Sequence, residues 1–68
     1  MYMHPVVSSN LQSVGYESGN LYIRFLKGGL YEYFNVPQHI YAGLMQASSH
    51  GEYFAQNIKN TYRYARIG

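Results

Sequence analysis

The chain contains no cysteine, no tryptophan and, among its three acidic residues, no aspartate. Without cysteine it can form neither a disulfide nor a thiolate zinc site, and nothing indicates a secreted, disulfide-bonded scaffold. Its 68 residues also place it close to the lower size limit for a domain, where apolar burial barely exceeds the loss of chain entropy. We therefore expect an efficient core, self-association or both, and homodimerisation is an open hypothesis.

Signals for a membrane or for export are missing as well. No stretch approaches the about 20 apolar residues that a membrane helix needs, and the N-terminus lacks a charged segment followed by an apolar one. A cytoplasmic location is therefore the default expectation. Nine tyrosines and three phenylalanines supply enough apolar surface for the chain to fold rather than stay disordered.

Residues suited to catalysis or metal binding are few. The absence of aspartate leaves no Ser-His-Asp triad, and no G-x-S-x-G motif is present. The histidines, His4, His39 and His50, lie at no recognised zinc-ligand spacing. We expect no catalytic residue, no metal site and no cofactor, and hence a binding protein rather than an enzyme.

The small positive net charge is unevenly distributed along the chain. Residues 1–58 carry two cations, Arg24 and Lys27, against three glutamates, a balance of −1. The last ten residues carry three cations, at positions 59, 63 and 66, and no acid, a balance of +3. This segment is either a solvated tail or an electrostatic footprint for phosphate groups.

Alternation and turn residues predict three strands after an extended lead-in over residues 1–8. The predicted strands begin near residues 10, 21 and 30, and turn clusters separate them at 17–20 and 27–29. In the second strand, apolar Leu21, Ile23 and Phe25 alternate with more polar residues, which indicates a half-buried strand. Two short turns predict an antiparallel meander.

The two predicted loops set the register of this meander. A four-residue first loop pairs Tyr16 with Leu21. A three-residue second loop, residues 27–29, pairs Arg24 with Glu32 on one face and leaves apolar pairs on the other.

Two short helices are predicted after the strands. Val36-Pro37 is a typical helix start, because proline is tolerated in the first turn. An apolar stripe with 3.6-residue spacing follows at Ile40, Tyr41, Leu44 and Met45. Ser49 and Glu52 fit a capping box that opens a second helix, whose apolar positions are Phe54, Ile58 and Tyr62. The predicted fold class is α+β, a three-stranded antiparallel β-meander with two short helices packed on one face.

Tyrosine is the remaining chemical feature. The simplest role for Tyr16, Tyr31, Tyr33, Tyr41 and Tyr53 is a core position, with the ring inward and the hydroxyl at the rim. A core that needs only apolar rings could use phenylalanine. Some of these hydroxyls are therefore candidates for a wet interface, a ligand cleft or a stacking surface.

A basic strip, defined as Lys59, Tyr62, Arg63, Tyr64 and Arg66, interleaves cations with aromatic rings. Such a strip can neutralise phosphates and stack unpaired bases, at about 1–3 kcal/mol for each stacked base. In the alternative interpretation, the two tyrosines anchor a C-terminal strand on the sheet while the cations point to water. The two interpretations are compatible.

The order of these motifs resembles the KTSC domain family. The resemblance rests on Ser8-Ser9, Gly15-Tyr16 followed by an acid, a glycine pair before Tyr31-x-Tyr33, Val36-Pro37, Tyr41, Ser49-x-Gly51-x-Tyr53-Phe54, Ile58-Lys59 and Tyr62-x-Tyr64. The family occurs at the C-terminus of some lysyl-tRNA synthetases and as free-standing small proteins of bacteria and phages. The resemblance implies a single domain over residues 1–68 and motif tyrosines that serve mainly in the core together with Phe54. It also suggests RNA binding, because some members of the family are attached to a tRNA-charging enzyme.

Three functional hypotheses follow. In the first, the chain binds RNA or another single-stranded nucleic acid, with the cations of the basic strip on phosphates and its tyrosines on bases. In the second, it is a homo-oligomeric protein that captures a small nucleotide-like ligand or a host protein. The third is a purely structural interaction domain.

Overall fold

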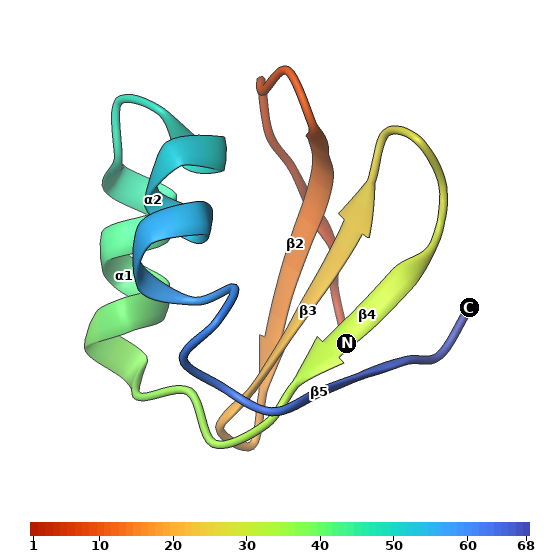
Figure 1. The fold of residues 1–68 in the computed structure, drawn as a ribbon, viewed down its shortest axis with the longest axis vertical. Helices are drawn as coiled ribbons and strands as arrows, with labels where there is room; N and C mark the ends of the chain where they lie inside the picture. Colours follow the sequence, from red (N-terminus) through yellow and green to blue (C-terminus); the bar gives the residue numbers. More distant parts are fainter.

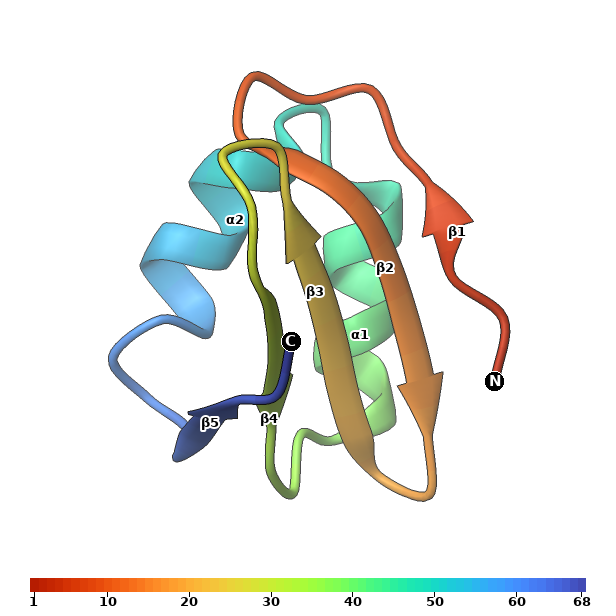
Figure 2. The ribbon, with the colours of Figure 1, turned by 90° about the vertical axis from the view of Figure 1, so that its right-hand side faces the viewer.

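The computed structural model describes residues 1–68 and has the predicted α+β fold. Its elements are β1 (His4–Pro5), β2 (Leu11–Glu17), β3 (Asn20–Phe25), β4 (Leu30–Tyr33), α1 (Gln38–Gln46), α2 (His50–Asn57) and β5 (Tyr64–Arg66). The strands form one antiparallel sheet in the order β1-β2-β3-β4-β5. Both helices cover one face of this sheet, as predicted (Figures 1 and 2). Neither helix has the length and apolar character needed to cross a membrane.

The sheet has five strands rather than the predicted three. The two additional strands are its edges: β1 lies in the expected lead-in and pairs with β2, and β5 lies in the C-terminal segment and pairs with β4. They contain only two and three residues, too few for a clear alternating pattern. A C-terminal strand anchored on the sheet was nevertheless one of the two interpretations of the basic strip, and β5 is that strand, with Tyr64 as its first residue. Pairing with a neighbouring strand, not local pattern, creates both.

The first hairpin has the predicted register. Tyr16 lies opposite Leu21, and pairing continues one step further toward the turn, so the loop consists of Ser18 and Gly19 alone. Both loop residues have positive φ, 54° and 80° respectively. This is the requirement of the two-residue hairpin turn whose twist matches that of the strands.

The second hairpin corrects the predicted register. Arg24 lies opposite Leu30 and not Glu32, whose partner across the strands is Tyr22. The loop does have three residues, but they are residues 26–28, one position earlier than predicted. Because the register moves by two residues, every side chain keeps its predicted face of the sheet.

Glycine geometry explains this shift. The amide of Gly28 donates to the carbonyl of Phe25 at 3.0 Å, and the amide of Phe25 donates to the carbonyl of Gly29 at 3.1 Å. Gly28 and Gly29 have φ values of 108° and 94°. A three-residue hairpin loop favours glycine at its last position, where φ is positive. The turn therefore overrides the apolar pairing on which the sequence prediction relied.

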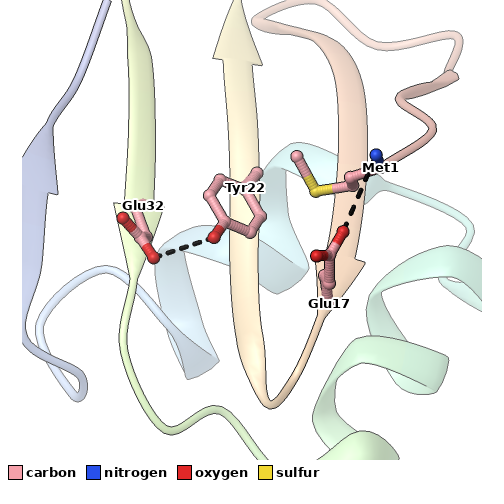
Figure 3. Close-up of polar contacts among 4 residues, drawn as sticks. All are labelled: Met1, Glu17, Tyr22 and Glu32. Atoms are coloured by element: carbon pink, nitrogen blue, oxygen red, sulfur yellow. Dashed lines mark hydrogen bonds and ion pairs between the residues drawn. The ribbon is translucent and has the colours of Figure 1, made fainter.

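Glu32 has different partners as a result (Figure 3). Its Oε2 accepts hydrogen bonds from the Tyr22 hydroxyl and from the Asn20 side-chain amide, both at 2.9 Å. The one ion pair of the structure joins the Met1 amino group to Glu17 Oε1 at 3.7 Å. The predicted Arg24–Glu32 ion pair does not form.

The core lies between the sheet and the two helices. Its buried members are Leu11, Val14, Leu21, Ile23, Tyr33, Val36, Leu44, Phe54 and Ile58. Among the motif tyrosines only Tyr33 is buried, while the rings of Tyr16, Tyr31, Tyr41 and Tyr53 are half-buried and pack against the core. The tyrosine rings thus extend the core outward to the surface.

The helix boundaries follow the local signals in the sequence. The helix α1 starts directly after Pro37. At the start of α2, the Ser49 hydroxyl accepts a hydrogen bond from the backbone amide of Glu52 at 3.2 Å. This is the serine-to-backbone half of the predicted capping box.

Candidate ligand-binding site

A cleft of about 410 Å³ opens where the helix-covered face of the sheet meets the C-terminal segment. It is lined by Asn10, Phe25, Lys27, Gly28, Tyr31, Tyr33, Phe54, Lys59, Asn60 and Tyr64. Half of these residues are aromatic, two are lysines, and none is acidic. We call this region the aromatic cleft.

The rings of the aromatic cleft come from three strands and one helix. Tyr31 and Tyr33 are two positions apart on β4, so both point to the same face of the sheet. Tyr64 on β5 lies directly opposite Tyr33, with ring centroids 5.4 Å apart and ring planes 32° apart. Phe54 of α2 meets Tyr33 and Phe25 edge to face, at centroid distances of 5.4 Å and 5.5 Å. Each ring is therefore held by another ring.

Two lysines supply the positive charge of the cleft. Lys27 belongs to the β3–β4 loop, and Lys59 follows α2. Neither takes part in an ion pair, since the one ion pair of the structure lies at Glu17. Both lysines are therefore free to pair with an anionic ligand, because no ion pair within the protein has to be broken first.

The side chains of Asn10 and Asn60 add amide groups to the lining of the cleft, and the Asn10 side chain is held in place by its neighbours. The Ser8 hydroxyl donates to Asn10 Oδ1 at 3.0 Å and accepts from the backbone amide of Leu11 at 3.2 Å. The Asn10 amide lies so close to Gly51 that a Cβ at that position would collide with it. This close approach accounts for the glycine three residues before Phe54, and it fixes one polar group at the edge of the cleft.

Arg66 lies outside the aromatic cleft but contacts one of its rings. It is opposite Tyr31 in the β4–β5 pair, and its guanidinium carbon is 5.9 Å from the Tyr31 ring centroid. Its Nε donates to the carbonyl of Gly68 at 3.0 Å. Arg66 therefore covers a ring of the cleft from the side of the chain terminus.

A second hollow, of about 470 Å³, is lined by residues 59–64. Of the basic strip, it contains Lys59, Tyr62, Arg63 and Tyr64. It shares Lys59, Asn60 and Tyr64 with the aromatic cleft. The structure therefore brings the cleft and most of the basic strip together into one continuous surface.

Burial changes the chemistry of the tyrosine at the base of the cleft. It raises the pKa of Tyr33 to about 12, and the neighbouring hydroxyls of Tyr64 and Tyr31 contribute to the same shift. The Tyr33 hydroxyl therefore keeps its proton further into the alkaline range than an ordinary tyrosine does. The floor of the cleft is uncharged, and its positive charge comes from the two lysines alone.

Sequence reasoning found only part of this site. It selected Lys59 and Tyr64, which line the cleft, but assigned Tyr31, Tyr33 and Phe54 mainly to the core. It missed the following lining residues: Asn10, Phe25, Lys27, Gly28 and Asn60. One available signal was the alternation that places Phe25 on the helix-covered face, at the end of a strand that leads directly into a loop lysine.

Comparison with known proteins is decisive for the family: residues 7–62 match the KTSC domain. The chain belongs to the KTSC domain family. A protein from Tsukamurella paurometabola is 33% identical over 90% of this chain and 94% of its own length. The crystal structure of a KTSC domain protein from Yersinia pestis superposes with a TM-score of 0.94, at 35% identity, over 98% of this chain and 97% of that one.

In this KTSC domain the motif tyrosines fall into two structural groups. Tyr16 donates from its hydroxyl to the carbonyl of Val36 at 2.5 Å, and its ring stacks on Tyr41 at 4.6 Å. Tyr53 lies against Gly43, where a Cβ would collide with it, so it joins α2 to α1. The Tyr31-x-Tyr33 pair instead forms the floor of the aromatic cleft.

Proposed function

We propose that this KTSC domain is a non-catalytic module that binds single-stranded nucleic acid, RNA in the first place, in the cytoplasm. The observation that supports the proposal is the composition of the aromatic cleft, which has two lysines, no carboxylate and five rings. Three of these rings, Phe25, Tyr31 and Tyr64, are half-buried or exposed. Aromatic rings stack on unpaired bases, and lysines neutralise the phosphates between them. Bases paired inside a duplex do not offer their faces to such rings, so single strands are the expected ligand.

The second candidate is capture of a small nucleotide-like ligand by a homo-oligomer. The volume of the cleft favours it, because about 410 Å³ falls within the range of about 300–1,000 Å³ that is typical of small-molecule sites. Both candidates require the same base and phosphate chemistry. They differ in how affinity depends on ligand length: a strand-binding module should bind an oligonucleotide more tightly than a mononucleotide, whereas a ligand-capturing protein should not.

Fluorescence anisotropy with labelled decamers tests the proposal. We expect single-stranded RNA and DNA to bind more tightly than a duplex of equal length. Three or four phosphate contacts should give log affinity against log salt a slope of about −2 to −3, at about 0.7 for each contact. Absence of salt-dependent binding to either single strand at low ionic strength refutes the proposal. A mononucleotide that binds as tightly as the decamer supports ligand capture instead.

A further inference from the structure

We infer that the aromatic cleft holds one unstacked base, and that Lys27 and Lys59 neutralise the two phosphates that flank it. This inference rests on the proposed function and specifies its ligand: the smallest ligand that makes all three contacts is a nucleoside 3′,5′-bisphosphate. The strand enters beside the β3–β4 loop and leaves through the second hollow.

The size of the cleft limits how many bases it takes. A volume of about 410 Å³ is near the lower end of the range for small-molecule sites, about 300–1,000 Å³. The rings that line it are tilted against one another: the plane of Tyr64 makes angles of 47° with Tyr31 and 32° with Tyr33. They do not form the row of parallel platforms that a run of stacked bases needs. One base therefore fits this arrangement better than several.

The position of β4 gives the path of the strand. Lys27 lies in the loop just before β4, and Arg63 lies just beyond its end, where the Arg63 carbonyl accepts from the Phe34 amide at 2.9 Å. The four residues of β4 span about 13 Å at about 3.3 Å per residue. The aromatic cleft and the second hollow meet at Lys59, Asn60 and Tyr64. Lys27 and Lys59 thus supply positive charge in the aromatic cleft, and Arg63 adds positive charge in the second hollow.

Lys27→Gln tests the inference, and Arg24→Gln is its matched control. Both variants remove one positive charge from the same exposed hairpin. Arg24, however, lies opposite Leu30 on the face away from the helices, outside the cleft. Circular dichroism and thermal unfolding should show that both variants fold. With a single-stranded decamer in 50 mM salt, Lys27→Gln should weaken binding about five- to tenfold and reduce the salt slope by about 0.7, whereas Arg24→Gln should leave both near wild type.

Three short ligands complete the test. A nucleoside 3′,5′-bisphosphate should bind wild type about five- to tenfold more tightly than the 5′-monophosphate or the 3′-monophosphate, because it adds one phosphate contact. Arg24→Gln should keep both gains, and Lys27→Gln should lose the gain over the monophosphate whose phosphate lies at Lys59. Equal effects of the two substitutions, or persistence of both gains in Lys27→Gln, overturn the inference while single-strand binding by wild type still upholds the proposed function. If wild type does not bind single strands at all, the proposed function fails first.

Discussion

Tyr33 and Tyr64 face each other across the β4–β5 pair, with ring centroids 5.4 Å apart. Tyr33 is 4% exposed and belongs to the core, whereas Tyr64 is 57% exposed and lies at the surface. This contact joins the hydrophobic core to the edge strand that carries the end of the basic strip. The same aromatic surface therefore stabilises the fold and forms the candidate site.

Truncating Tyr33 should separate its two roles. Tyr33→Ala removes a buried ring and should lower the free energy of unfolding by roughly 3 kcal/mol or more, a large share of the total for a domain this small. Tyr33→Phe keeps the ring and should stay close to wild type, because the Tyr33 hydroxyl has no hydrogen-bond partner within the protein. Urea unfolding measures both. If Tyr33→Phe is stable but loses nucleic-acid affinity, the hydroxyl contacts the ligand. Unchanged affinity limits Tyr33 to packing in the core.

The corrected register predicts unequal costs for two charged residues of one hairpin. Glu32→Ala removes the acceptor of two hydrogen bonds, from Tyr22 and Asn20, and should cost about 1–2 kcal/mol. Arg24→Ala removes a side chain that makes no hydrogen bond or ion pair and should change stability by less than about 0.5 kcal/mol. Chemical denaturation of the two variants gives the comparison. Similar costs would contradict the observed pairing and favour an Arg24–Glu32 interaction.

Charge reversal in the basic strip should act on binding rather than folding. Replacing Arg63 and Arg66 by glutamate changes the charge of the last ten residues by −4, from +3 to −1. If both cations contact phosphates, the salt slope for a single strand should flatten by up to about 1.4. Affinity should fall to a similar extent for different sequences, because phosphate contacts do not read bases. An unchanged slope would show that these two cations do not contact phosphates.

Stacking is best tested at Tyr64 with Tyr2 as the control. The two rings are 57% and 67% exposed, but only Tyr64 lines the cleft. Tyr64→Leu should weaken single-strand binding by about 1–3 kcal/mol with little change in the salt slope, and Tyr2→Leu should have no effect. Tyr62 is less suitable, because its half-buried ring packs against the core. Equal binding by all three proteins would argue against stacking on Tyr64.

Stability should fall in alkaline solution because Tyr33 is buried. Its pKa is raised to about 12 in the folded chain, against an ordinary value of about 10 in the unfolded chain. The folded state thus retains the proton longer, so this contribution to stability is complete below about pH 10 and is lost as pH rises through about 12. The difference in unfolding free energy between wild type and Tyr33→Phe should change over that interval. A difference that is constant from pH 9 to 12 would contradict the raised pKa.

Local chemistry determined much of the fold before any tertiary contact was considered. Alternating residues, turn glycines, Pro37 and the Ser49 cap act over a few neighbouring residues, which is why the three central strands, both helices and the faces of the sheet could be predicted. The second hairpin shows where this reasoning fails. Apolar pairing and turn geometry favoured different registers there, and the glycines at positions 28 and 29 favoured the observed one.

The edge strands and the candidate site depend on tertiary structure. No pattern in the sequence indicated β1, and β5 was only one of two interpretations of the basic strip. Both are short and exist because a partner strand offers them hydrogen bonds. The aromatic cleft collects residues from positions 10 to 64, and no local pattern states which of these distant side chains meet. The sequence alone therefore predicted a basic, tyrosine-bearing strip. Only the pairing of β5 with β4, which sets Tyr64 opposite Tyr33, brought two members of that strip, Lys59 and Tyr64, into the lining of a cleft.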